Sequence, residues 1–148
     1  MAQKNLAALL VSIVGILAAP ASSARDDLNK YPISEAMSAP DATAKLNRGI
    51  KFFFGGSAHP AVAKSFGVFT SNKKTNGFGK VDKDACNWAF LSATLSFQDR
   101  ALAEGGDAVI NIESYYKKQL LVSETEFECG SGALMSGVTF RGEVVKLQ

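Results

Sequence analysis

The sequence is poor in the residues that most enzyme and metal sites require. Its 148 residues include one histidine, His59, and two cysteines, Cys86 and Cys129. His59 stands before a proline in a turn-like stretch, where a lone histidine is usually exposed rather than a catalytic base. Metal sites need clustered histidine, cysteine or carboxylate ligands. The sequence therefore predicts no metal, no cofactor and no catalytic residues, and it leans away from an enzyme without deciding the point.

A phosphate-binding P-loop is also lacking. The motif GxxxxGK[ST] needs two glycines at a set spacing so that backbone N–H groups can cradle phosphate. Gly79 and Lys80 imitate its end, but Val81 replaces Ser or Thr and Lys74 stands where the first glycine belongs. A weaker anion site near a helix N-terminus, made by Lys73, Lys74 and Lys80, remains an alternative to an ordinary solvated basic loop.

Excess charge of either sign is nearly absent, because 16 basic residues meet 14 acidic ones and the formal net charge is +2. Such a balance implies no overall attraction for nucleic acid or acidic membrane. Residues 1–24 have Lys4 as their sole charge, an apolar run from Leu6 to Ala19, and small residues at their end. We predict a secretory signal peptide, cleaved after Ala21 or Ala24.

The alternative for this leader is a membrane anchor, but an apolar run of about 14 residues is short for a bilayer span, which takes roughly 20. No later segment is apolar enough to span. We therefore expect a periplasmic or secreted protein with no transmembrane segment once the signal peptide is removed.

The two cysteines lie in the part of the chain expected to be exported, where disulfides persist. They allow one intramolecular pairing, which closes a loop of about 43 residues. The chain-entropy model gives such a bond about 4 kcal/mol of stabilisation. The alternative is two free thiols, with Cys86 reactive near a helix N-terminus. The sequence has no CxxC motif, and a Cys86–Cys129 disulfide is favoured.

The hydrophobic pattern predicts one domain over 50–148, preceded by a loosely packed polar arm at 25–49. Within the arm, Pro32 and Pro40 flank two short helical turns, at 33–38 and 41–47. Asp82 is expected to cap a long helix over 83–104, which Gly105 and Gly106 end. A loop is expected at 72–80. Strands are expected at 50–56, 63–71, 107–116, 125–129 and 133–147, with a bulge at Gly137 or Gly142.

This order predicts an α+β fold. The expected architecture is a two-layer sandwich in which one long helix packs on a four- to five-stranded, mostly antiparallel sheet. One helix face carries small and aromatic residues at i, i+3 and i+4 spacing: Cys86, Ala89, Phe90, Ala93, Phe97 and Ala101. A second apolar stripe consists of Trp88, Leu91, Leu95 and Leu102. Either the arm covers this stripe or another molecule does.

Three segments together resemble a known domain. They are Cys86 opening an Ala-rich helix, GGDAVINIES at 105–114, and FECGSGALMSGVTFRGEVVKL at 127–147. The combination resembles the globular domain of the outer-membrane lipoprotein that senses envelope stress for the Rcs phosphorelay, and its heavy-metal-binding-like βαββ relatives. The resemblance implies a bond between Cys86 and Cys129. The sensor's second disulfide has no counterpart, since Met135 replaces one of its cysteines, and the lipidated cysteine is absent.

Over 31–147 the chain resembles more closely a group of small exported bacterial proteins with the run SNKKTN…F.K.D..AC.WAFLSA, often labelled "excinuclease ATPase subunit". A DNA-repair role is disfavoured, because the chain has neither a P-loop nor a zinc-binding cysteine set. Neither resemblance supplies catalytic residues.

These observations lead to two functional hypotheses. The first is an exported, disulfide-stapled, non-enzymatic envelope domain that acts by protein–protein contact, for example in envelope stress sensing or maintenance. Its partner would be an unknown envelope protein or a second copy, not nucleic acid. The contact would use the second stripe or the edge formed by Tyr115, Tyr116, Lys117 and Lys118. The alternative is a periplasmic protein that binds a small ligand or an anion at the three loop lysines.

Overall fold

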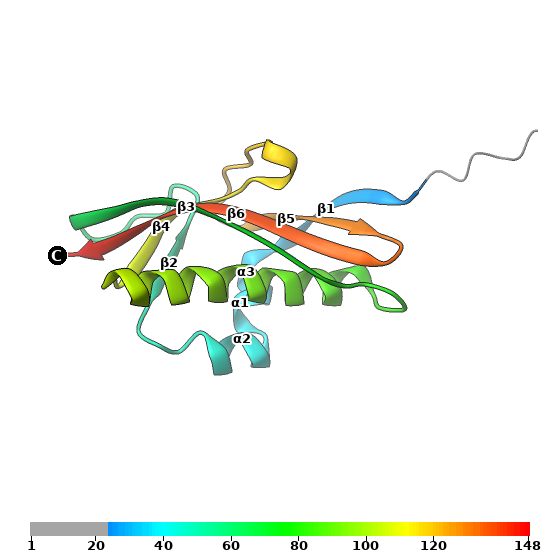
Figure 1. The fold of residues 1–148 in the computed structure, drawn as a ribbon, viewed down its shortest axis with the longest axis horizontal. Helices are drawn as coiled ribbons and strands as arrows, with labels where there is room; N and C mark the ends of the chain where they lie inside the picture. Colours follow the sequence, from blue (N-terminus) through cyan, green and yellow to red (C-terminus); the bar gives the residue numbers. More distant parts are fainter. Residues whose placement is uncertain (1–23) are drawn as a thin grey trace, which may run out of the picture.

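The computed structural model describes residues 24–148, so the predicted signal peptide lies outside the described residues apart from Ala24. Figure 1 shows a twisted sheet with one long helix across one face. The strands are β1 (Asp26–Pro32), β2 (Lys51–Phe54), β3 (Val62–Asn76), β4 (Ala108–Ser114), β5 (Glu126–Gly132) and β6 (Met135–Leu147). The helices are α1 (Ile33–Ser38), α2 (Pro40–Lys45), α3 (Asp82–Glu104) and a 3-10 turn, η1 (Tyr116–Lys118). The predicted α+β class is confirmed.

Strand β6 is the centre of the six-stranded sheet. It pairs antiparallel with β3 along its whole length, and on its other side with β5 at its start and β4 at its end. β1 extends the sheet beyond β5, and β2 extends it beyond β4. Within residues 24–148 the β2–β4 pair is parallel and the other pairs are antiparallel. The prediction of a mostly antiparallel sheet is therefore correct, and the sheet has one strand more than expected.

The additional strand comes from the segment expected to be a loose arm. Residues 26–32 pair with β5 in an unbroken register, from Asp26 opposite Gly132 to Pro32 opposite Glu126. Pro32 has no N–H to donate, which an edge strand tolerates at its end. The next residue, Ile33, is buried in the main core. The expectation of loose packing at 25–49 is thus wrong, although the predicted helical turns are present as α1 and α2.

The predicted loop at 72–80 is also shorter than expected. β3 continues to Asn76 because β6 offers backbone partners as far as Met135, opposite Asn76. The turn then closes through the Asn76 side chain, whose Oδ1 accepts the N–H of Phe78 at 2.9 Å. Lys73 and Lys74 consequently belong to a strand, whereas Lys80 lies in the turn.

Helix α3 matches its predicted range, but its start differs in detail. The N-cap residue is Val81, and no side chain caps the helix. The Asp82 carboxylate instead contacts the guanidinium group of Arg25. At the other end Gly105 has φ +80°, the left-handed conformation that glycine adopts without strain. Gly106 follows it, and a Cβ there would lie 2.8 Å from the carbonyl oxygen of Val145.

The main core lies between α3 and the sheet. The predicted small and aromatic face of α3 is buried in it, and Phe90 is in ring contact with Phe54, Phe127 and Phe140. A bulge was expected at Gly137 or Gly142. The bulge lies in β4, opposite Gly142, where the two residues Asn111 and Ile112 face this one residue of β6. Asn111 takes the left-handed conformation there, with φ +50°.

Gly137 marks no bulge and pairs with Gly130 of β5. The ring of Tyr116 lies on this glycine pair, and a Cβ on Gly130 would fall 2.0 Å from the tyrosine hydroxyl oxygen. The absence of side chains at these two positions therefore makes room for an aromatic ring from η1. Two contacts hold η1 on the sheet. The ring of Tyr116 packs on the glycine pair, and Nζ of Lys117 lies 2.5 Å from the carboxylate of Asp26.

Asp107 joins the start of β4 to the end of β6 and gives the fold a pH-dependent contact. Its Oδ1 accepts the N–H of Leu147 at 2.8 Å, and its Oδ2 lies 3.0 Å from Nζ of Lys146. The backbone hydrogen bond from Leu147, followed by the contact with Lys146, lowers the pKa of Asp107. Because the folded-state pKa lies below the unfolded value of about 3.9, the stabilisation is present above that pH and is lost as the pH falls through the folded-state pKa.

We expect Asp107→Asn to lower the free energy of unfolding by about 0.5–1 kcal/mol at pH 7, because the contact is partly exposed. Asparagine mimics the protonated side chain, so the difference from the wild type should shrink toward zero at about pH 2. Urea unfolding of both proteins across this pH range measures the effect. A difference that is equally large in acid would contradict it.

Candidate functional site

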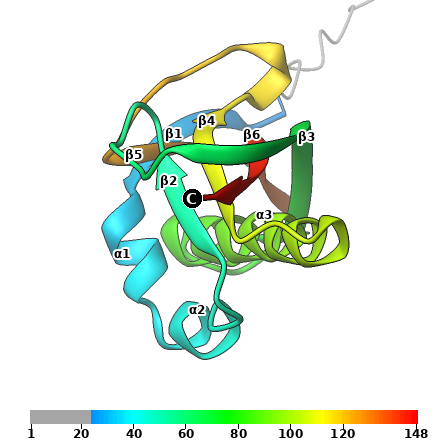
Figure 2. The same cartoon turned by 90° about the vertical axis from the view of Figure 1, so that its left-hand side faces the viewer.

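Helices α1 and α2 pack against the side of α3 that faces away from the sheet's centre (Figure 2, where α3 is seen nearly end-on). Ala36 of α1 and Ala42 of α2 are buried, and their small side chains allow the close approach. The end of α2 is tied to α3 by a hydrogen bond of 3.1 Å from Nε2 of Gln98 to the carbonyl oxygen of Lys45. The segment expected to be a loose arm therefore covers part of α3.

The four residues of the second apolar stripe of α3 have different surroundings, because α1 and α2 cover only part of the helix. Leu91 is 3% exposed, and Leu102 packs against the main core. Leu95 is half-buried at a different hollow, between α3 and β3, which Lys73, Ser92, Ser96 and Asp99 also line. Trp88 remains 42% exposed. The structure thus does not bring the four predicted residues into one contact surface, and it leaves Trp88 as the exposed member.

Trp88 forms one wall of a groove between the α1–α2 pair and the first half of α3. The groove has a volume of about 300 Å³. Its lining consists of small or apolar residues and three polar side chains: Ala36, Ala39, Asp41, Ala42, Asp84, Asn87, Trp88 and Leu91. Of these, the sequence predicted Trp88 and Leu91. Asp84 and Asn87 were missed because they are polar residues outside the apolar stripe of α3, and the residues of the α1–α2 pair because they meet α3 only after those helices have folded back onto it.

The polar groups of the groove are mainly hydrogen-bond acceptors. Asn87 has a buried Oδ1 without a hydrogen-bond partner in the part of the chain that the structure describes. Asp84 has no ion pair among residues 24–148, whereas Asp41 lies 3.9 Å from Nζ of Lys45. The same Nζ lies 5.1 Å from the centroid of the Trp88 ring, a cation–π distance. Asp41 and the Trp88 ring thus already have the Lys45 ammonium beside them. The acceptors that remain, Asp84 and Oδ1 of Asn87, suit a positively charged hydrogen-bond donor such as an ammonium or guanidinium group.

No protein-family model, curated protein or solved structure matches this chain. The chemistry of the groove is therefore the observation on which a function can be argued. None of the helices within residues 24–148 combines the length and the apolar character that crossing a bilayer requires.

The three predicted anion-binding lysines do not converge. Neighbouring residues of a strand point to opposite faces. Lys73 accordingly lies on the helix side, in the hollow beside Leu95 and Asp99, whereas Lys74 lies on the other side against Gly137. Lys80 is in the turn before α3. The reason is the extension of β3, which alternates the side chains that a loop could have gathered.

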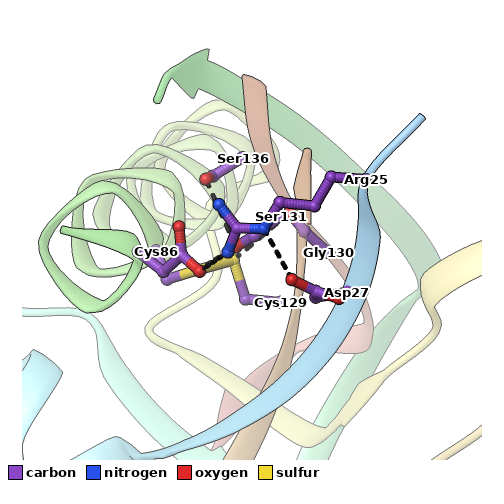
Figure 3. A network of polar contacts seen from close by, with 8 residues as sticks. Arg25, Asp27, Cys86, Cys129, Gly130, Ser131 and Ser136 are labelled. Atoms are coloured by element: carbon purple, nitrogen blue, oxygen red, sulfur yellow. Dashed lines mark hydrogen bonds and ion pairs between the residues drawn. A yellow bond between two sulfur atoms is a disulfide. The ribbon is translucent and has the colours of Figure 1, made fainter. Parts of the chain in front are cut away.

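The predicted disulfide is present. Cys86 of α3 and Cys129 of β5 are joined at a Cα–Cα distance of 5.9 Å, and both are fully buried. The alternative of a reactive free thiol at Cys86 is therefore wrong. The hydroxyl of Ser131 lies 3.4 Å from Sγ of Cys86, and that of Ser136 lies 3.4 Å from Ser131 (Figure 3).

A network of charged side chains lies at the same end of the domain as this disulfide. Arg25 contacts both Asp27, at 2.6 Å, and Asp82 of the first turn of α3 (Figure 3). The hydrogen bonds that Arg25 donates, that to Asp27 first and that to Asp82 second, raise the pKa of Arg25. The network joins the start of β1 to α3. The other end of β1 is held by Ile33, the residue after the strand, which is buried in the main core.

His59, the one histidine of the sequence, contacts neighbouring groups of its own chain. His59 packs edge-on against Phe53, with ring centroids 5.6 Å apart, and its Nδ1 lies 2.8 Å from the carbonyl oxygen of Pro60. Residues 24–148 contain no group of three histidine, cysteine or acidic side chains arranged to hold a metal ion.

Proposed function

We propose that this protein is an exported, disulfide-stapled, non-enzymatic domain of the cell envelope that acts by contact with another protein. The contact surface is the groove beside Trp88. The single observation that carries the proposal is the combination of an exposed tryptophan with the unpaired acceptors of Asp84 and Asn87 in one hollow.

The groove's chemistry selects the partner's side chain. A lysine or arginine entering between Asp84 and Trp88 would supply donors for both the carboxylate and Oδ1 of Asn87. It would also place its alkyl part against the apolar floor at Leu91. Tryptophan is enriched among the residues that dominate protein–protein binding. The partner is therefore proposed to present a basic side chain flanked by small or apolar residues.

The buried Cys86–Cys129 bond supports placement outside the reducing cytoplasm, because such bonds persist in oxidising compartments. A periplasmic or secreted location is part of the proposal. So is a role in envelope stress sensing or maintenance, which rests on the resemblance to the Rcs sensor domain and on the cysteine pair that both share.

The test is photo-crosslinking in living cells from a photoreactive phenylalanine analogue at position 39, on the rim of the groove, followed by mass spectrometry of the adducts. We expect a discrete protein adduct whose yield falls about tenfold or more in Asp84→Lys, because a lysine there repels the partner's cation. Thermal unfolding should show that the variant is folded.

Asp99→Lys is the matched control, because it makes the same charge reversal on the same helix outside the groove. It should leave the adduct unchanged. If Asp84→Lys and Asp99→Lys give the wild-type yield, or if position 39 gives no protein adduct, the groove is not the contact surface and the proposal fails.

A further inference from the structure

One end of the domain carries a group of exposed apolar side chains. Phe78 and Val81 lie in the turn between β3 and α3, Leu134 lies in the turn between β5 and β6, and Met135 is the first residue of β6. They are between 46% and 70% exposed, with Phe78 the most exposed. Scattered surface apolar residues are ordinary, but several large ones gathered at one place indicate an interaction site.

The two turns are held side by side. The N–H of Gly77 donates a hydrogen bond of 2.8 Å to the carbonyl oxygen of Leu134, and Asn76 is paired with Met135. Figure 1 shows both turns at the end of the sheet where β1 begins. The apolar side chains therefore project from the joined ends of three strands and one helix, a rigid base that keeps them together.

Two lysines without an ion pair in the described part of the chain lie beside these side chains. They are Lys74 and Lys80. Two acids follow this turn in the first turn of α3: Asp82 is paired with Arg25, and Asp84 has no ion pair among residues 24–148. The whole chain has a formal net charge of only +2. At this end, the exposed apolar side chains are accompanied by Lys74 and Lys80, which have no ion pair within the described residues.

The chain also enters the domain at this end. β1 starts with Asp26 opposite Gly132, and a Cβ on Gly132 would lie 3.2 Å from the carbonyl oxygen of Arg25. Residues 1–24, with their apolar run, are connected here. Before the predicted signal peptide is cleaved, the short connection from its apolar run to Asp26 keeps this end of the domain close to the membrane that the peptide enters.

We propose that this end, defined by Phe78, Val81, Leu134 and Met135, docks on the surface of an anionic phospholipid bilayer. The four side chains enter the boundary between headgroups and acyl chains, and Lys74 and Lys80 contact the lipid phosphates. Lysine suits this arrangement, because its alkyl stem lies along apolar surface while its ammonium group stays at the polar level. The domain is thereby oriented with its groove beside Trp88 off the membrane and open to a protein partner.

The test is co-sedimentation of the exported protein, with its N-terminus established by intact mass, with vesicles of phosphatidylglycerol and phosphatidylethanolamine. We expect binding that weakens in about 0.5 M salt, which screens the lysines. Phe78→Ser with Leu134→Ser should weaken the vesicle affinity by roughly tenfold or more, because the apolar area entering the bilayer is lost. Lys74→Ala and Lys80→Ala should each weaken it by about fivefold.

The matched control is Leu120→Ser with Val122→Ser, two exposed apolar residues in the loop that precedes β5, at the opposite end of that strand. This variant should bind vesicles as the wild type does, and circular dichroism should show that all variants are folded. The proposal is overturned if the wild type does not sediment, or if both serine pairs have the same effect. It is also overturned if phosphatidylcholine vesicles bind equally well, or if Phe78→Ser with Leu134→Ser instead separates a dimer.

Discussion

Replacing both cysteines with alanine should lower the free energy of unfolding by about 4 kcal/mol. The bond between Cys86 and Cys129 closes a loop with a sequence separation of 43, and its removal returns that loop's conformational entropy to the unfolded chain. Both side chains are fully buried, so the change also removes packing atoms. Urea unfolding measures the difference, which is a large share of the 5–15 kcal/mol typical of a domain.

Reduction provides the control for this prediction. A thiol reductant present during urea unfolding should destabilise the wild type by a similar amount and leave the Cys86→Ala, Cys129→Ala protein unaffected. A loss below about 1 kcal/mol would mean that the chain-entropy argument does not apply to this domain.

Phe90→Ala should lower the free energy of unfolding by about 3–5 kcal/mol. Phe90 is fully buried, and its ring centroid lies 4.7 Å from that of Phe127, 5.4 Å from that of Phe140 and 5.7 Å from that of Phe54. Truncation leaves a cavity where α3, β2, β5 and β6 meet, so no single element can move to fill it. Equilibrium urea unfolding again gives the measurement.

Two further variants separate the cavity from a general effect of removing phenylalanine. Phe90→Leu keeps most of the volume and should cost less than Phe90→Ala. Phe78→Ala removes a ring that is 70% exposed and should change stability by no more than about 0.5 kcal/mol. If Phe90→Ala were as mild as Phe78→Ala, the four rings could not be the centre of the core.

The features that could be predicted from the sequence are those set by local pattern. Helix α3 has 23 residues with apolar positions at helical spacing and a glycine at its end, and both its range and the buried face were correctly predicted. The disulfide followed from the presence of only two cysteines in a chain predicted to be exported. The α+β class followed from one such helix among short alternating strands.

The features that could not be predicted depend on partners distant in the sequence. Residues 26–32 are mostly polar, and they become a strand because β5 presents a free edge about a hundred residues later along the chain. β3 continues through two lysines because β6 is long enough to pair with it. In both cases the backbone hydrogen bonds of a neighbour outweigh weak local preferences.

The candidate site was predicted in part for the same reason. The stripe on α3 identified Trp88 and Leu91 as residues needing a partner surface, and the hypothesis that the chain's own arm covers the stripe holds for Leu91. The arm's contribution of Asp41 and three alanines to a groove depends on how α1 and α2 lie against α3. Composition carries no information about that arrangement.

For this protein, the sequence by itself determined the long helix, its buried face and the covalent bond to Cys129, since these depend on residue spacing and on cysteine chemistry. The tertiary structure alone decided that Lys73 and Lys74 face opposite ways, that Trp88 borders an acidic groove, and that four exposed apolar side chains share one end. The physical reason is that a surface is formed by residues from several elements, and long-range strand pairing, not local pattern, determines which of them become neighbours.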